Sequence, residues 1–368
     1  MSGPTKRVSL VMPSASPTGG AEEAFLQLLR SEAAKQIAWQ AIFLEEGPLV
    51  EVVRDYAEES FVVPCGRTRE LYKWWRAAGE IGRHAQRFGA SLIFGWMTKG
   101  HVYGGLAGWR KRISAGWFQM GLPEDDLLGR MSRWLPAKVV VACSEFVAQE
   151  QSAKQPRANV VAVALGVDLS RFDLASLPSP REAREQLELP LEGPLVGIVG
   201  RMQRWKGMHT LIGAMPRVLE SHPDAHCLIV GGPYPAEPDY PDELRRQAEA
   251  LGVAEKVIFA GAQTNVPLWM QAMDLFVHAS EREPFGIVIV EALALGKPVI
   301  ACAPGGPEHT LAEAPGCGLA AFEDPRALAA AIVERLSEPA GQPKQRVRIS
   351  DGYSAERYAE RCIGRLVV

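Results

Sequence analysis

Two glutamates, Glu283 and Glu291, form the pattern in this sequence with the clearest chemical meaning. The apolar residues between them predict a helix that begins near Gly286, and Pro284 permits a tight turn before it. The N–H groups at a helix N-terminus lack partners within the helix, so they can bind sugar hydroxyls or phosphate oxygens. Carboxylates accept hydrogen bonds from diols, so both glutamates suit a sugar or a ribose. The plainer interpretation is a helix cap and a surface ion pair, but Glu291 lies in an apolar helix where a carboxylate needs a partner.

A pair of cations, Arg201 and Lys206, follows directly after the apolar run Leu195–Gly200, which is predicted to end a strand. Such a pair fits a diphosphate, because the arginine fork binds two oxygens at once and the lysine supplies a compact charge. A solvated basic loop is the alternative interpretation. Arg204, between the two, is the cation that we expect to take no part.

Two glycines, Gly19 and Gly20, follow the first predicted strand and precede a predicted helix. Paired glycines at this position offer open backbone donors to an anion or a sugar. The segment lacks the Gly-x-Gly-x-x-Gly spacing, and the sequence has no Gly-Lys-Ser/Thr phosphate loop. Dinucleotide-binding and ATP-binding loops are therefore disfavoured.

Short apolar runs alternate with amphipathic stretches along nearly the whole chain, which is typical of parallel sheets covered by helices. The strands predicted in the first half are Val8–Met12, Trp39–Leu44, Phe61–Val63, Ser91–Phe94, Ile113–Trp117, Val139–Cys143 and Val160–Ala164. Those predicted in the second half are Leu195–Gly200, His226–Val230, Val257–Ala260, Leu275–His278 and Val299–Cys302. The predicted helices include Glu22–Lys35, Glu70–Arg87, Arg181–Leu187, Met208–Ser221, Asp242–Leu251, Gly286–Leu295 and Ala327–Leu336. The proline-punctuated segment 174–194 predicts a linker between two doubly wound α/β domains, which bind ligands at the C-terminal ends of their strands.

The composition is that of an ordinary globular protein, with 47% hydrophobic and 23% charged residues in a chain of 368, enough for two domains. A net charge of −3 argues against a dedicated nucleic-acid binder. The six cysteines show no metal-binding spacing, so we expect small buried hydrophobic residues in a reducing compartment. The apolar run that stops at Pro13 is too short for a secretion signal, and no segment reaches the ~20 apolar residues of a membrane span. We therefore expect a cytoplasmic protein.

The stretch Cys65–Lys138 departs from this balance, with 13 basic and five acidic residues and six of the nine tryptophans. Basic residues mixed with tryptophan mark a surface that faces a membrane, or else an amphipathic helix with solvated arginines and buried tryptophans. The first interpretation predicts peripheral contact with the inner face of a membrane and a lipid or membrane-bound glycan as acceptor.

The three motifs, in this order, are similar to those of the retaining glycosyltransferases of family 4 (glycosyl transferases group 1), which have the GT-B fold. The resemblance includes Gly166–Phe172 at the domain junction, Gly305–Glu308 after the last strand of the second domain and Tyr353–Arg357 in a final helix. It implies two Rossmann-like doubly wound domains that face a cleft. The domains would be an acceptor-binding domain at 1–165 and a nucleotide-sugar-binding domain at 166–349. A C-terminal helix at 350–368 would pack back on the first domain.

The resemblance implies that the glutamate motif binds the sugar part of the donor. Glu291 would bind the ribose hydroxyls of the nucleotide. Glu283 would contact the transferred sugar, together with the backbone of Phe285, Gly286 and Ile287.

The resemblance assigns the diphosphate to the two other motifs. Arg201 and Lys206 would hold the β-phosphate and stabilise charge on the leaving group. Gly19 and Gly20 would close over the phosphates, and Gln263 would border the base. Neither a metal ion nor a cofactor is expected.

The acceptor side departs from the family pattern. Many relatives carry a histidine after the fifth strand of the first domain, where this chain has Gln119. An amide can bond a sugar hydroxyl but cannot act as a base. His101, after another strand of the same domain, is the alternative catalytic candidate.

The predicted activity is metal-independent, retaining transfer of a hexose from a nucleoside-diphosphate sugar to an acceptor hydroxyl, with UDP favoured over GDP. The implied setting is synthesis of a glycan, a glycolipid or a cell-envelope polysaccharide. Two alternatives stay open. A sugar-nucleotide epimerase would convert the free donor sugar without an acceptor. A degenerate GT-B scaffold would bind its ligand without catalysis, and Gln119 in place of the usual histidine leaves this second alternative open.

Overall fold

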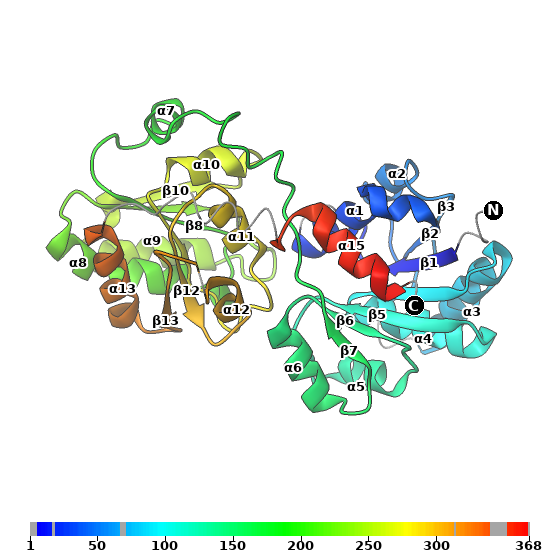
Figure 1. Cartoon of the computed structure of the whole chain (residues 1–368). Coiled ribbons are helices and arrows are strands. Elements are labelled where there is room, and N and C mark those ends of the chain that lie inside the picture. Colours follow the sequence, from blue (N-terminus) through cyan, green and yellow to red (C-terminus); the bar gives the residue numbers. More distant parts are fainter. Residues whose placement is uncertain (1–5, 17–18, 67–70, 313, 339–351, 367–368) are drawn as a thin grey trace. The chain divides into compact units, whose positions relative to one another are not determined.

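The computed structural model describes residues 6–16, 19–66, 71–312, 314–338 and 352–366 (Figure 1). The chain divides into two compact units. Unit 1 comprises Met1–Gly166 together with Ser354–Val368, and unit 2 comprises Val167–Tyr353. The predicted boundary between 349 and 350 lies outside the described residues.

Unit 1 is built on a parallel sheet of seven strands in the order β3-β2-β1-β4-β5-β6-β7. The strands are β1 Lys6–Met12, β2 Ile37–Phe43, β3 Glu59–Val62, β4 Leu92–Trp96, β5 Ser114–Gln119, β6 Val140–Ala142 and β7 Val160–Ala162. The helices are α1 Gly20–Arg30, η1 Glu32–Gln36, α2 Leu49–Val53, α3 Leu71–Phe88, α4 Met97–Lys111, α5 Leu127–Trp134, α6 Glu145–Lys154 and α15 Ala355–Leu366. The strand order reverses between β1 and β4, the topological switch point at which doubly wound sheets open a crevice.

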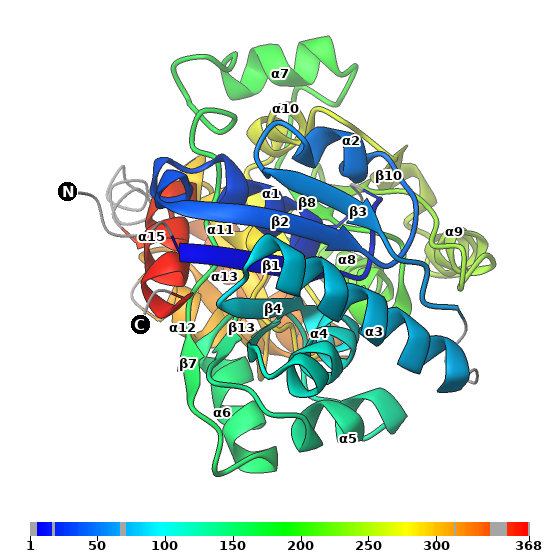
Figure 2. The same ribbon diagram turned by 90° about the vertical axis from the view of Figure 1, so that its right-hand side faces the viewer.

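Helices cover both faces of the unit 1 sheet (Figure 2). Neighbouring residues of β4 point to opposite faces: Ile93 packs in a core with Trp74 of α3 and Tyr103 of α4, whereas Phe94 and Trp96 point the other way. On that second face the ring of Trp96 meets α1, and α15 packs on α1. The terminal helix is therefore an integral part of unit 1.

Unit 2 is built on a parallel sheet of six strands in the order β10-β9-β8-β11-β12-β13. The strands are β8 Leu195–Val199, β9 His226–Val230, β10 Val257–Gly261, β11 Leu275–His278, β12 Val299–Ala303 and β13 Gly318–Ala321. The helices are α7 Pro180–Gln186, η2 Arg204–Lys206, α8 Met208–Ser221, α9 Tyr240–Ala250, η3 Ala254–Lys256, α10 Val266–Ala272, α11 Ile287–Ala294, α12 Pro307–Leu311 and α13 Pro325–Ser337. Here the order reverses between β8 and β11.

The prediction of two doubly wound α/β domains is confirmed, with two local corrections. Strand β13 was not predicted, because Gly-Leu-Ala-Ala has no run of β-branched or aromatic residues. The predicted helix Glu22–Lys35 ends at Arg30, because Ser31 adopts an extended conformation and its side chain caps the separate turn η1. None of the described helices is long and apolar enough to cross a bilayer.

Candidate functional site

The loops that follow β8 and β11 leave the unit 2 sheet at its switch point. These strands pair directly and in parallel, so their C-terminal ends lie at the same edge of the sheet. The first loop runs through η2 into α8 and contains Arg201 and Lys206. The second runs from Ala279 to Gly286 and contains Glu283. The topology thus brings together two motifs that lie some 80 residues apart in the chain.

The two loops approach each other closely because a glycine lies at the contact. Gly207, which ends η2 and starts α8, has φ +69°, and a Cβ built there would lie 2.0 Å from the carbonyl oxygen of Ala279. Only glycine fits a positive φ at so short a distance. The backbone N–H of Glu281 also donates to the carbonyl of Trp205 at 2.8 Å. The two loops therefore pack directly against each other at this edge.

Lys206 and Glu283 form a buried ion pair at this edge. Nζ of Lys206 lies 2.8 Å from Oε2 of Glu283, with the two side chains 17% and 10% exposed. Nε2 of His278, the last residue of β11, lies 3.2 Å from the same carboxylate oxygen. The ring of Trp205 faces the ammonium, with its centroid 3.9 Å from Nζ. One carboxylate is thus bound by two nitrogen donors in a partly desolvated setting.

The surroundings of Glu283 hold it in its ionised form. Burial opposes ionisation, but the Lys206 charge and the hydrogen bond from His278 outweigh it, and the pKa of Glu283 is well below its usual range. A carboxylate of this kind accepts hydrogen bonds and does not donate a proton. It therefore cannot serve as a general acid near neutral pH.

Two positioning groups around Glu283 were not predicted. His278 closes an apolar strand, and the only signal for it was its place at the C-terminal end of β11. Gly306, in the motif after β12, donates its N–H to the carbonyl of Glu283 at 2.8 Å. Glu308 in turn accepts the N–H of Gly305 at 2.9 Å. A third loop thereby fixes the backbone of Glu283.

Helix α11 places the rest of the glutamate motif. Gly286 has φ +84° and precedes the helix, so the N–H groups of the first turn lack partners within the helix. Ile287 and Glu291, one turn apart, lie on the same helix face and are half-buried, whereas Ile289 and Val290 are fully buried. Phe285 is buried and its ring packs near Tyr353. Glu291 therefore lies on the accessible side of an apolar helix.

The other residues predicted for the site in unit 2 lie on the loops after β8 and β10. Arg201 is exposed, with its guanidinium 5.1 Å from the ring centroid of Tyr234. Arg204 pairs with Glu243 at 2.6 Å. Gln263 follows the edge strand β10, and its amide donates to the carbonyl of Ala260 at 2.6 Å. Strand β9 separates that residue from the Lys206 loop.

The predicted residues of unit 1 lie near the C-terminal ends of its strands. Gly19 precedes α1, and Gly20 is exposed at its first position; Pro17 and Thr18 before them lie outside the described residues. Gln119 ends β5 and is 1% exposed, and its carbonyl oxygen accepts the hydroxyl of Thr98 at 3.1 Å. That side chain is already engaged within unit 1.

His101 does not occupy the open position that the sequence suggested. Helix α4 begins at Met97, immediately after β4, and carries His101 into the interior, where it is 0% exposed. Its ring stacks on Trp117 with centroids 4.8 Å apart and an angle of 5°. Burial lowers the pKa of His101 to about 4, so the imidazole is neutral. A fully buried, neutral ring of this kind fits a structural role.

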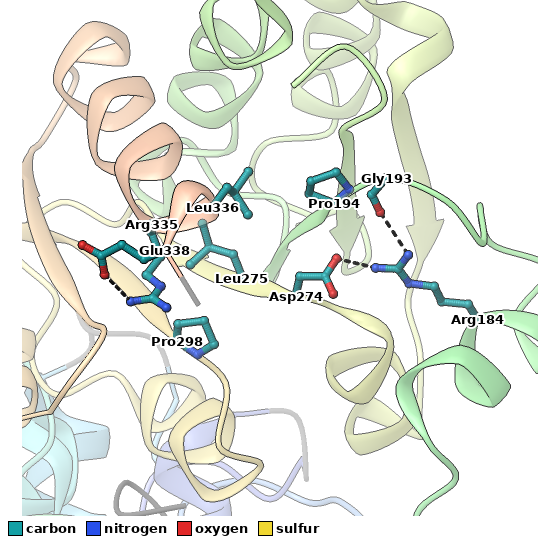
Figure 3. Close-up of a pocket in the computed structure, with 9 residues that line it drawn as sticks. All are labelled: Arg184, Gly193, Pro194, Asp274, Leu275, Pro298, Arg335, Leu336 and Glu338. Atoms are coloured by element: carbon teal, nitrogen blue, oxygen red, sulfur yellow. Dashed lines mark hydrogen bonds and ion pairs between the residues drawn. The ribbon is translucent and has the colours of Figure 1, made fainter. Parts of the chain in front are cut away.

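A cavity of about 320 Å³ lies at the opposite edge of the unit 2 sheet (Figure 3). Pro194, Asp274 and Pro298 line it, and each immediately precedes a strand, so the cavity is at the N-terminal ends. Its two arginines are bound by the protein: Arg184 by Asp274 and the carbonyl of Gly193, and Arg335 by Glu338 at 2.9 Å (Figure 3). Internal partners satisfy these charges, which favours a structural role.

No group of three or more His, Cys, Asp or Glu side chains suited to a metal ion occurs in the part of the chain that the structure describes. The absence of a metal from the reaction stays a prediction.

Comparison with known proteins agrees with this architecture. The solved structure of HepE from Anabaena in complex with UDP and glucose matches with a TM-score of 0.83 at 21% identity, covering 98% of this chain and 99% of that one. Sucrose-phosphate synthase from Thermosynechococcus elongatus matches with a TM-score of 0.77 at 22% identity, over 98% of each chain. At this identity the likeness establishes the fold, which is the two-domain GT-B fold of glycosyltransferases.

The relatives found by sequence have a higher identity to this chain, but their matches cover a smaller part of each protein. D-inositol 3-phosphate glycosyltransferase from Corynebacterium urealyticum is 33% identical over 204 residues, which are 54% of this chain and 48% of the relative. The lipopolysaccharide core biosynthesis mannosyltransferase LpsB from Rhizobium meliloti is 34% identical over 139 residues, 37% of this chain and 38% of the relative. These matches span less than half the length of the relatives. Residues 179–353 match the family model of the glycosyl transferases group 1.

Proposed function

We propose that this chain transfers a hexose from a nucleoside-diphosphate sugar to an acceptor hydroxyl, with retention of configuration and without a metal ion. The observation that carries the proposal is the buried Lys206–Glu283–His278 cluster at the switch point of unit 2. A donor sugar combines a diphosphate, a ribose and a hexose, and this edge offers cations, an open helix N-terminus and two carboxylates for them.

Lys206 is the group suited to the leaving diphosphate. An ammonium has three N–H donors, of which one goes to Glu283. The others can bond a phosphate oxygen, on which negative charge builds as the bond to the sugar breaks. Because Glu283 and Trp205 fix the ammonium in advance, little reorganisation is needed at the moment of reaction. Exposed Arg201, five residues earlier, supplies a second cation with a two-oxygen fork.

Glu283 acts as a positioning acceptor. Its low pKa keeps it ionised, so it can bind hydroxyls of the transferred hexose. In the transfer the bond between the anomeric carbon and the phosphate oxygen breaks, and the bond to the acceptor oxygen forms on the same face. The acceptor proton passes to the leaving phosphate oxygen. No second enzyme carboxylate is required as nucleophile.

Glu291 is proposed to bind the ribose, because it lies on the accessible face of α11 one turn from the helix start. UDP is favoured over GDP as the nucleotide, which agrees with the UDP complex of the HepE neighbour. The acceptor is proposed to be a glycan, a lipid or another hydroxyl compound.

The first experiment is a thermal-shift panel with UDP, GDP, ADP and NAD. A ligand at about 100 times its Kd should stabilise the folded state by roughly 2.7 kcal/mol. We expect UDP to raise the melting temperature, Glu291→Ala to abolish the effect, and Glu334→Ala, an exposed glutamate on α13, to leave it intact. A panel in which no diphosphate shifts the wild type would contradict the donor site and favour a scaffold.

Catalysis is tested separately with UDP-hexoses and a panel of acceptors. Product whose anomeric configuration matches the donor, seen by NMR and insensitive to a chelator, would support retaining and metal-independent transfer. Conversion of the free donor to its epimer without an acceptor would instead identify an epimerase.

A further inference from the structure

The exposed large apolar side chains of the described residues gather on one part of unit 1. Nine such side chains are exposed in all, and five of them come from α3, α4 and α5. The five are Tyr72 (78% exposed), Trp75 (49%), Trp109 (60%), Leu127 (52%) and Trp134 (89%). They include every tryptophan that is exposed in the described part of the chain. Scattered exposed apolar residues are ordinary, but a concentration of this kind marks an interaction surface.

These helices form one layer over a single face of the unit 1 sheet (Figure 2). Arg110 at the end of α4 donates to the carbonyl of Trp75 on α3 at 2.6 Å and lies 3.9 Å above its ring. Helix α4 also lies close to the end of α5. A Cβ atom added at Gly105 of α4 would be 3.2 Å from the Cβ of Leu135, the residue after Trp134. The exposed tryptophans therefore belong to adjoining helices.

The interpretation of the tryptophan-rich stretch as a buried set is wrong for half of it. Trp74, Trp96 and Trp117 are 3%, 0% and 1% exposed and fill the core. Trp75 and Trp109 face solvent although core positions adjoin them in sequence. Their exposed rings do not contribute to the core that Trp74, Trp96 and Trp117 fill.

The same layer is positively charged. Five exposed arginines make no ion pair within the described residues. Of the nearby acids, Glu80 lies on α3 and Glu124 and Asp126 adjoin the start of α5, whereas Asp125 is engaged by Arg133 and Lys154 at 3.0 and 2.6 Å. The five arginines are Arg76, Arg83, Arg87, Arg112 and Arg130. The whole chain has a net charge of −3, so this cationic surface is a local feature.

We propose that the exposed residues of α3, α4 and α5 form a membrane-docking surface for bilayers with anionic headgroups. Tryptophan and tyrosine combine an apolar ring with a polar N–H or O–H, which suits the boundary between acyl chains and headgroups. Arginines bind lipid phosphates by charge and by paired hydrogen bonds. Leu127 and the fully projecting Trp134 favour a bilayer over a nucleic acid, whose backbone offers no apolar layer. The inference deepens the proposed function by placing the acceptor in or near a membrane, but the docking itself needs no sugar transfer.

The test is co-sedimentation of the full chain with vesicles of phosphatidylcholine and phosphatidylglycerol in equal amounts, at low salt and without nucleotide. We expect the wild type to sediment, to be released by salt, and to bind pure phosphatidylcholine only weakly. The variant Arg76→Gln, Arg83→Gln, Arg130→Gln should bind roughly fivefold more weakly for each arginine removed. Trp109→Ala with Trp134→Ala should weaken binding and abolish the blue shift of tryptophan fluorescence on vesicles.

A matched charge control lies on unit 2, where Arg217, Arg246 and Arg326 are exposed on other helices. The variant with all three changed to Gln should bind as the wild type does. Equal weakening by this control would overturn the proposed surface, as would a wild type that does not sediment. Binding of single-stranded nucleic acid or an acidic protein without vesicle binding would assign the surface to that partner. Because no donor is present, failure here leaves the UDP response of the proposed function untouched.

Discussion

The two units share one scaffold but differ at their switch points. In unit 2 the edge after β8 and β11 holds a buried ionic cluster around Glu283. In unit 1 the edge after β1, β4 and β5 is held by hydrogen bonds between neutral groups: the indole N–H of Trp96 donates to the carbonyl of Ala21 at 3.0 Å, and Gln119 binds the hydroxyl of Thr98. This edge also carries the buried carboxylate of Glu22, but no ion-pair cluster of this kind within the described residues. Buried charges are stable only when they have partners, and Lys206 and Glu283 meet this condition by pairing with each other.

The largest expected effect comes from breaking the ionic cluster. Lys206→Ala leaves a buried carboxylate without its cation, which should cost about 3–5 kcal/mol of unfolding free energy. The UDP response should disappear as well. Urea unfolding and thermal shifts measure the two effects. Arg204→Ala, two residues away and paired at the surface, is the control and should change neither appreciably. Equal losses from both variants would contradict the special role of Lys206.

The next effect is the pH dependence of the same cluster. The pKa of Glu283 in the folded chain lies below its unfolded value of about 4.3, because Lys206 and His278 outweigh the effect of burial. The carboxylate therefore stabilises the fold fully above that pH, and the contribution is lost as the pH falls below it. We expect the stability difference between wild type and Glu283→Gln to shrink on acidification, as measured by urea unfolding at several pH values. A difference independent of pH would argue that Glu283 is not ionised in the fold.

In unit 1 we expect His101 to make the free energy of unfolding depend on pH in a different range. Its folded pKa of about 4 lies below the usual 6.5 because of burial. As the pH falls from about 6.5 towards 4, the unfolded chain binds a proton that the folded chain excludes, so stability declines. His101→Gln should reduce this slope while the UDP response persists. If the folded variant no longer gains thermal stability from UDP, His101 has a functional role after all.

The smallest effect is expected at Gln119 of unit 1. Gln119→Ala leaves the hydroxyl of Thr98 without its acceptor, at a cost of about 1 kcal/mol. UDP should still stabilise the variant, whereas KM for the acceptor should rise. The double variant with Thr98→Ala separates the two contributions, because it removes both partners and should recover part of the stability. An unchanged acceptor KM would remove Gln119 from the acceptor side.

Much of the fold could be predicted because the local signals agree with the tertiary structure. Strand His226–Val230 and helix Met208–Ser221 have the predicted bounds, since each is a continuous pattern between turn residues. Strand β13 escaped prediction, because Gly318–Ala321 is short and its pairing with β12 decides its conformation.

The site could be predicted one motif at a time, but not its internal contacts. Lys206 and Glu283 were each expected at a strand end, yet a carboxylate and an ammonium 77 positions apart carry no local sign of their ion pair. His278 was hidden within an apolar strand. His101 was predicted as a catalytic candidate because it follows a predicted strand. In the structure α4 begins immediately after β4 and carries the side chain into the interior.

The return of α15 to unit 1 has a consequence for synthesis on the ribosome. Tyr358 and Cys362 of this helix are fully buried, and the ring of Tyr358 lies 6.2 Å from that of Phe118. The first unit to emerge therefore cannot complete its core until residues beyond the whole of unit 2 have been made. Unit 2, continuous from Val167 to Tyr353, can close first although it is translated second. Unit 1 must meanwhile keep an apolar groove beside α1 open, a period in which chaperone protection would matter most.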